Sequence, residues 1–252
     1  MKRLVILIAL VSTWTALMAP AVFGLGYSIQ IYQNAYSSGI GGEFTIVSED
    51  LRDVAGGYTG TGTQGVREDS PFNFETFCLE YNEYFNPGVT YYYYAEINPN
   101  NAAIAGGEPG SYDVISQGTA WLYLQFISGS LQGYNYTNFS TRKNSAGVLQ
   151  QAIWYLEEEG PGDINNVYVQ LAMAQYGAAG LTAEQNLSLT KADYNGTSVK
   201  VLNVWADSSK HAADLRQDQL VATGVPVPEP TTLLLLGLGL IGLGLSSRKF
   251  KK

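Results

Sequence analysis

The sequence predicts an α+β protein: a β-sandwich or barrel-like subdomain with an inserted helical subdomain, an N-terminal signal peptide and a C-terminal single transmembrane helix. Apolar and polar residues alternate in short runs over residues 25–100 and again over 181–222, which is typical of strands. Over residues 113–178 apolar residues instead recur at spacings of three and four, which is typical of helices. Strands, then helices, then strands indicate one β domain with a helical insertion, at residues 25–224.

The first 24 residues are typical of a secretory signal peptide. Lys2 and Arg3 give a charged start, an apolar run follows over residues 4–11, and small residues stand at Ala19 and Ala21. We therefore expect the chain to be exported.

Four strands are expected before residue 100. Residues 27–32 and 44–47 alternate, and the aromatic-rich runs 72–84 and 89–97 are separated by the turn residues Asn86-Pro87-Gly88. The loop before them contains a literal match to the dinucleotide fingerprint at residues 60–65. No buried strand precedes that match and no helix opens after it, so it does not predict a nucleotide site.

Helices are expected at residues 113–128, 145–159 and 164–178, where apolar residues line one face. The acidic run 157–159 is expected to be a solvated helix end, because glutamates are rarely buried. Strands return at residues 198–205 and 219–221.

The body of the chain is acidic. Removing residues 1–24 and 231–252 leaves 206 residues, which keep 8 of the 14 Lys and Arg and all 22 Asp and Glu, a net charge of −14. Such a body gains nothing from nucleic acid or an anionic lipid surface. We expect no nucleic-acid partner.

The C-terminal segment 225–252 has three parts: a Pro-rich stretch with Pro228, Glu229 and Pro230, an uncharged run over residues 231–247, and a basic tail. As a helix, the uncharged run would span about 25 Å, the short end of what crosses a bilayer. The basic tail favours the cytoplasm, which places the body outside.

This ending resembles the PEP-CTERM sorting signal of Gram-negative bacteria. The resemblance implies an inner membrane-anchored precursor that an exosortase-type transpeptidase cleaves near residues 228–230, with delivery to the cell surface or extracellular matrix. The alternative is a plain tail anchor.

Cys78 is the single cysteine, so it has no internal disulfide partner in an oxidising compartment. It stands in the aromatic, strand-like run Phe77-Cys78-Leu79-Glu80. The thiol is either a buried small hydrophobic group or a group used for chemistry.

The helix expected at residues 145–159 carries Leu149-Gln150-Gln151-Ala152-Ile153-Trp154. With the run around Cys78, this resembles the two halves of the thioester domain of Gram-positive surface proteins, where an aromatic-Cys-aliphatic-acid motif meets a Thr-Gln-x-Ala-x-Trp-like motif. The resemblance implies an internal thioester that acylates a partner. Its bond would join Cys78 and Gln150, within surroundings formed by Phe77, Glu80, Ala152 and Trp154. Leu149 departs from the family, which usually has Thr or Ser there.

Helical periodicity does not decide between Gln150 and Gln151, because each lies well off the centre of the apolar face. The resemblance favours Gln150. A rigid strand facing a rigid helix can hold a thiol and an amide in attack geometry, and the aromatics can exclude water.

The sequence therefore predicts an exported surface or matrix protein, serving adhesion or biofilm formation, that attaches covalently to a protein amine or polysaccharide hydroxyl. We expect no metal and no Ser-His site, since the lone histidine, His211, has no supporting partners. Thioester chemistry requires no cofactor. We also expect no enzyme: a glycosidase is a third alternative, but no spacing of the aspartates and glutamates picks out a catalytic pair. The alternative is a non-covalent structural or carbohydrate-binding matrix protein, in which tyrosines such as 91–94 stack on sugars and the buried cysteine is inert.

Overall fold

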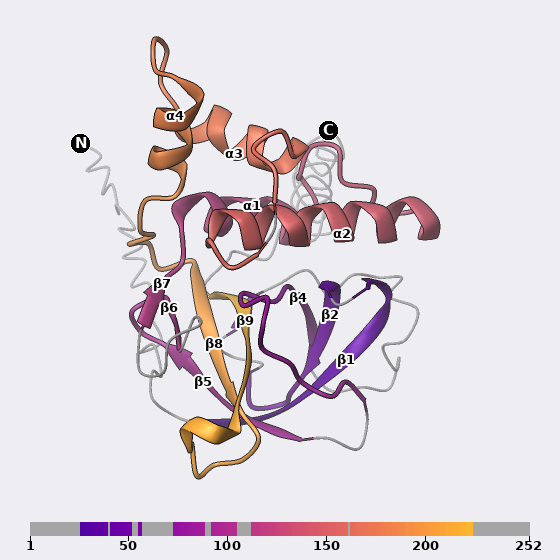
Figure 1. Ribbon diagram of the computed structural model, residues 1–252. Coiled ribbons are helices and arrows are strands. Elements are labelled where there is room, and N and C mark those ends of the chain that lie inside the picture. The colour runs from indigo at the N-terminus through magenta and orange to yellow at the C-terminus, as the bar shows by residue number, and fades with distance from the viewer. Residues whose placement is uncertain are drawn as a thin grey trace, which may run out of the picture.

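The computed structural model describes residues 26–39, 41–51, 55–56, 73–88, 92–104, 112–160 and 162–223 (Figure 1). The expected signal peptide, the glycine-rich match at 60–65, the motif at 228–230 and the expected helix at 231–247 lie outside these residues. Within them the fold is mixed α+β, with a large antiparallel sheet and four helices. No helix among the described residues combines the length and apolar character needed to cross a membrane.

Seven strands form the main sheet in the order β3-β9-β8-β5-β1-β2-β4, and all neighbours are antiparallel. They are β1 (Gly26–Ser38), β2 (Gly41–Val47), β3 (Ala55–Gly56), β4 (Asn73–Thr76), β5 (Tyr93–Asn98), β8 (Val199–Trp205) and β9 (Leu215–Thr223). A separate hairpin pairs β6 (Ala102–Ile104) with β7 (Tyr112–Val114).

The sheet curls until the segment that follows β4, at one end of the sheet, joins β9, the strand next to the other end. Leu220 donates its backbone N–H to the carbonyl of Phe77 (3.2 Å), and Leu79 donates to the carbonyl of Asp218 (3.0 Å). Cys78 lies between them and pairs with Gln219. Cys78 therefore sits where the strand at one end of the sheet joins β9.

Two apolar clusters follow from the alternation of strand side chains. One fills the enclosed face of the sheet and includes Ile29, Ile46, Ala95 and Cys78. The other lies between the opposite face and the helices and includes Phe77. Consecutive residues thus enter different clusters, because successive side chains point to opposite faces.

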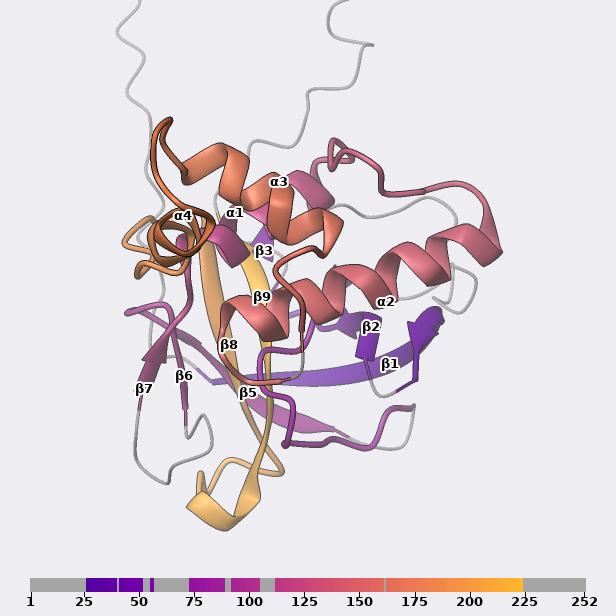
Figure 2. The ribbon, with the colours of Figure 1, turned by 45° about the horizontal axis from the view of Figure 1, so that its top comes forward.

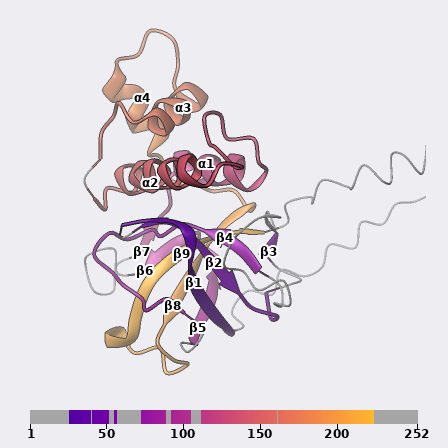
Figure 3. The same ribbon diagram turned by 90° about the vertical axis from the view of Figure 1, so that its right-hand side faces the viewer.

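The helices form layers on one side of the sheet (Figures 1 and 3). They are α1 (Gln117–Ile127), α2 (Phe139–Leu156), α3 (Val167–Tyr176) and α4 (Ala183–Thr190). The long helix α2 crosses above β1 and β2 and packs against both (Figure 2), while α3 packs against α1, α2 and α4.

Each helix begins where a side chain caps it. Ser116, Asn138, Asn166 and Thr182 each accept a hydrogen bond from a backbone N–H in the first turn. Such caps satisfy donors that have no partner within the helix, and they set the observed starts.

Several expected boundaries were wrong. Residues 113 and 114, expected in a helix, belong to β7 instead, because the Ser116 cap delays α1. The cap at Asn138 starts α2 six residues earlier than expected. The expected strand 72–84 ends as β4 at Thr76, and the region expected to hold only strands after residue 181 contains α4.

Candidate functional site at Cys78 and Gln150

The fold brings Gln150 of α2 against the backbone of Cys78, 72 positions away in the sequence. The Gln150 Nε2 donates to the Cys78 carbonyl oxygen (2.7 Å), and the Cys78 N–H donates to Gln150 Oε1 (3.1 Å). These two bonds fix the plane of the amide beside the cysteine. Gln150 is buried, whereas Gln151 is exposed on the same helix.

A second backbone group binds the same amide oxygen. The N–H of Gly42 in β2 donates to Gln150 Oε1 (3.4 Å), so this oxygen lies between two backbone donors. Gly42 has φ +103°, in the left-handed half of the map that favours glycine. Two converging N–H groups are the arrangement that stabilises negative charge developing on a carbonyl oxygen.

The neighbouring Gly41 lets α2 approach β2 closely. A Cβ at this position would lie 2.5 Å from Gln150 Cγ and 2.6 Å from Trp154 Cη2. Because these distances are far below van der Waals contact, a glycine at residue 41 is needed for Gln150 to reach Cys78.

The thiol of Cys78 is completely buried and free. Burial raises the pKa of this thiol far above its ordinary value, the hydrogen bond from Gln219 opposes the rise, and the nearby Glu80 adds to it. The Gln219 Nε2 lies 3.5 Å from Cys78 Sγ. The sulfur is therefore a protonated thiol at neutral pH, with one amide donor beside it.

Glu80 belongs to a group of buried carboxyls next to the cysteine. Its Oε2 accepts the backbone N–H of Asp218 (2.8 Å), and its Oε1 has no hydrogen-bond partner in the described part of the chain. Burial, followed by the charges of Asp218 and Glu83, raises the pKa of Glu80 well above its usual value. Burial likewise raises the pKa of Asp218 to about 8. Burial thus disfavours the ionised form of both carboxyls.

Trp154 covers the other side of Gln150. Its ring meets Tyr81 edge to face at 5.0 Å, and its Nε1 has no hydrogen-bond partner in the described residues. A pocket of about 340 Å³ lies beside these rings, lined by Ser38, Gly39, Tyr81, Gly147, Gln150, Gln151 and Trp154. Gln150 therefore faces Cys78 on one side and this pocket on the other.

The remaining motif residues lie in the core. Ala152 and Phe77 are fully buried in the cluster under the helices, and Phe77 packs edge to face on Phe126 at 5.0 Å. They frame the site through packing and make none of the hydrogen bonds to Gln150.

A buried ion pair fixes α2 to β2 two turns before Gln150. Arg142 donates from Nε (2.9 Å) and Nη2 (2.8 Å) to the two oxygens of Glu43, whose side chain is fully buried. Tyr134 also donates its hydroxyl to Glu43. Because Glu43 follows Gly42, this pair positions the backbone donor that contacts Gln150.

Sequence reasoning did not find Gly41, Gly42, Gln219 or the ion pair. The paired glycines within a strand were an available signal, since glycine inside a strand often marks a close approach of backbone. The expectation for the acidic run 157–159 was wrong for Glu157, which is buried and accepts the N–H of Ser116 (3.1 Å).

Two further expectations can be compared with the structure. Of the tyrosines proposed to stack on sugars, Tyr93, the first residue of β5, is buried, and Tyr92, just before the strand, is exposed. His211 is exposed. No group of three or more His, Cys, Asp or Glu side chains in the described ranges could hold a metal ion.

Residues 226–249 match the PEP-CTERM protein-sorting motif. This match implies an exported protein that an exosortase-type enzyme processes, with transient anchoring in the membrane before sorting to the cell surface. No curated protein and no solved structure matches the chain.

Proposed function

We propose that the surface-sorted protein is a single-use acyl donor, whose internal Cys78–Gln150 thioester attaches it covalently to an amine or hydroxyl on a partner surface. The observation that carries the proposal is the position of Gln150: its amide is bound at both ends by the Cys78 backbone, and its oxygen lies between two N–H groups.

Thioester formation is a balanced condensation. The Cys78 sulfur attacks the side-chain carbonyl carbon of Gln150, the S–C bond forms and the C–N bond breaks. The thiol proton leaves on the nitrogen, so one ammonia is expelled. The N–H groups of Cys78 and Gly42 stabilise the negative charge on the oxygen during attack.

Attachment transfers the Gln150 acyl group from the Cys78 sulfur to a nucleophile on the partner. An incoming amine or hydroxyl attacks the same carbon, its proton passes to the sulfur, and the free Cys78 thiol is regenerated. The pocket lined by Tyr81 and Trp154 gives such a group access to Gln150. The aromatic rings limit competing attack by water.

Methylamine tests the assignment of the acyl donor. The wild-type chain is expected to gain one methylamine on Gln150, and both Cys78→Ala and Gln150→Ala should abolish the adduct. Gln151→Ala is the matched control, because Gln151 is the exposed neighbour on the same helix, and it should react normally. Loss of the adduct in Gln151→Ala alone would overturn the assignment.

A second candidate is a non-covalent matrix protein with an inert cysteine. The complete burial of Cys78 and the raised pKa of its thiol favour this candidate. A wild-type chain that never yields an adduct and keeps the full sequence mass would establish it.

A further inference from the structure

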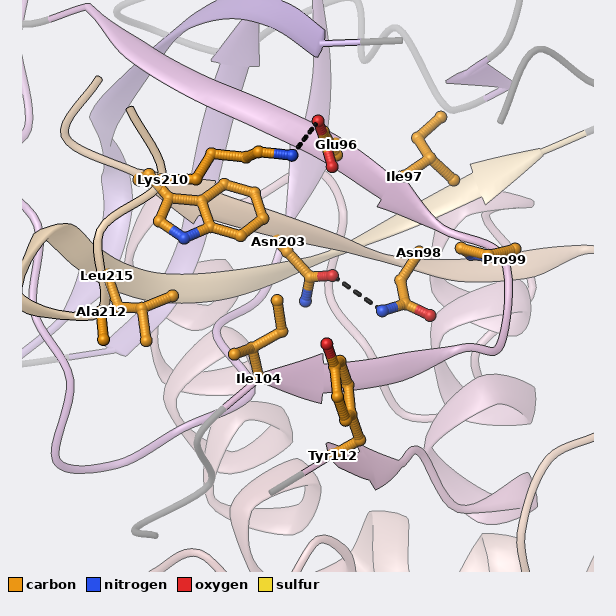
Figure 4. A pocket seen from close by; sticks show the side chains of 11 residues that line it. Glu96, Ile97, Asn98, Pro99, Ile104, Tyr112, Asn203, Lys210, Ala212 and Leu215 are labelled. Carbon is orange, nitrogen blue, oxygen red and sulfur yellow. Dashed lines mark hydrogen bonds and ion pairs between the residues drawn. The ribbon is translucent and has the colours of Figure 1, made fainter. Parts of the chain in front are cut away.

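A second pocket has a volume of about 500 Å³ (Figure 4). It is lined by the C-terminal halves of β5 and β8, by the β6–β7 hairpin and by residues between Lys210 and Leu215. It shares no lining residue with the pocket beside Gln150. Its size falls within the range of small-molecule sites. The residues that matter for its chemistry are Glu96, Asn98, Tyr112, Asn203, Trp205 and Lys210.

Two carboxamides form a fixed polar wall of this pocket. Asn98 Nδ2 donates to Asn203 Oδ1 (2.9 Å), and Asn203 Nδ2 donates to the carbonyl of Ala102 (3.1 Å) and to Asp218. Asn98 Oδ1 in turn accepts the N–H of Asn100 (2.8 Å). Both amides are therefore locked in orientation. No described residue takes the second Nδ2 hydrogen of Asn98, which is available to a ligand.

An ion pair lies on the side of the pocket opposite the Asn98–Asn203 wall. Lys210 Nζ lies 3.0 Å from Glu96 Oε1, and the two side chains are 42% and 21% exposed. They therefore offer a donor and an acceptor that remain accessible. Because the lysine is already paired with a carboxylate, the pocket carries no free positive charge to attract an anion.

Aromatic and aliphatic side chains complete the lining. Tyr112 is 68% exposed, and Figure 4 shows its hydroxyl directed toward the Asn98–Asn203 pair. Trp205 and Ile104 add apolar surface to the same pocket. A flat aromatic side chain with a polar tip provides contact area at little cost in conformational entropy.

This combination excludes several classes of ligand. A phosphate or nucleotide finds no unpaired cation. A purely apolar ligand would remove water from the Asn98 amide and the ion pair without replacing their hydrogen bonds, which is unfavourable. An added peptide strand has no free edge on β5, which pairs with β1 and β8.

We propose that this pocket binds a neutral saccharide of one or two pyranose units. A pyranose ring offers C–H groups on its faces, which suit the exposed ring of Tyr112, and hydroxyls around its edge. Those hydroxyls accept hydrogen bonds from the Asn98 amide and the Lys210 ammonium, and they donate a hydrogen bond to the Glu96 carboxylate. The site goes beyond the proposed acyl transfer and does not depend on Cys78 or Gln150.

The test uses the full-length chain in a detergent without a sugar headgroup. Cellobiose, maltose and N,N′-diacetylchitobiose are the probes, titrated by saturation-transfer NMR and calorimetry. The variants are Tyr112→Ala, Tyr112→Phe and Lys210→Met. Tyr92→Ala is the matched control, because it removes an equally exposed tyrosine outside the pocket.

At least one disaccharide is expected to bind. Tyr112→Ala should weaken the affinity for this disaccharide about tenfold, which corresponds to the energy of roughly one aromatic ring contact. Lys210→Met and Tyr112→Phe should weaken the affinity less. Tyr92→Ala should leave binding unchanged. Cys78→Ala should also bind normally, which separates this site from the thioester. Absence of binding by all three sugars would overturn the proposal, as would unchanged binding in both Tyr112→Ala and Lys210→Met.

Discussion

Replacing Gly41 with alanine should separate Gln150 from Cys78 while leaving the fold intact. The added Cβ would lie 2.5 Å from Gln150 Cγ and 2.6 Å from Trp154 Cη2. Ordinary carbon contacts need about 3.5 Å, so α2 or the Gln150 side chain must move by about 1 Å. Overpacking of this kind costs about 1–3 kcal/mol of unfolding free energy.

The chemical effect should be larger than the effect on stability. A displacement of about 1 Å in a reacting pair costs about 100-fold in rate. It would also lengthen the bonds from Cys78 and Gly42 to Gln150 Oε1, which are already 3.1 and 3.4 Å. We therefore expect Gly41→Ala to carry little or no thioester.

The assay is intact-mass spectrometry of the purified variant, with the fraction of chains that lack one ammonia as the readout. Urea unfolding followed by circular dichroism gives the change in stability. Gly129→Ala is the control: Gly129 has φ +70° and open space around it, so alanine there strains the backbone by about 1–2 kcal/mol without touching the site. A complete thioester in Gly41→Ala would refute the reasoning.

Three further outcomes are expected. Arg142→Met should lower the unfolding free energy by about 3–5 kcal/mol, because it leaves Glu43 buried without its cation; urea unfolding that shows no loss would contradict this. Burial raises the pKa of Glu157 to about 7, so the stability that its protonated form contributes should be present below about pH 4.5 and lost as the pH rises toward 7; in Glu157→Gln, thermal unfolding should vary less over that window. Replacing residues 228–230 should leave the protein in the inner membrane, and a tail-free protein in the medium would contradict the role of that motif.

Local patterns predicted where strands and helices fall because they reflect the period of each element. The alternation in residues 27–32 and 44–47 corresponds to parts of β1 and β2, and the spacing in 164–178 corresponds to α3. Boundaries failed where a single capping side chain decides them. Asn138 is an example, since its amide starts α2 in a stretch without apolar periodicity.

The contact between Gln150 and Cys78 could not be predicted from periodicity. Gln150 lies off the centre of the apolar face, yet it is buried because Gly41 lets β2 approach α2 there. Its burial is made favourable by three hydrogen bonds from segments far apart in the sequence. Only the resemblance of the Cys and Gln motifs favoured this glutamine over Gln151.

Glu157 was misjudged for a related reason. A glutamate at the end of an acidic run is usually solvated, but this one meets the first turn of α1. It accepts the N–H of Ser116 at 3.1 and 3.3 Å from its two oxygens. Such partners come from tertiary packing and leave no local signal.

The intact mass of the wild-type protein tests the proposed thioester most directly. Purified without amines and measured before any reducing or basic treatment, the mature chain should lack the mass of one ammonia. Cys78 should then resist alkylation after mild acid unfolding, until hydroxylamine cleaves the bond. A mass equal to that of the full mature sequence, with Cys78 alkylated at once on unfolding, would contradict the thioester and leave an inert buried cysteine.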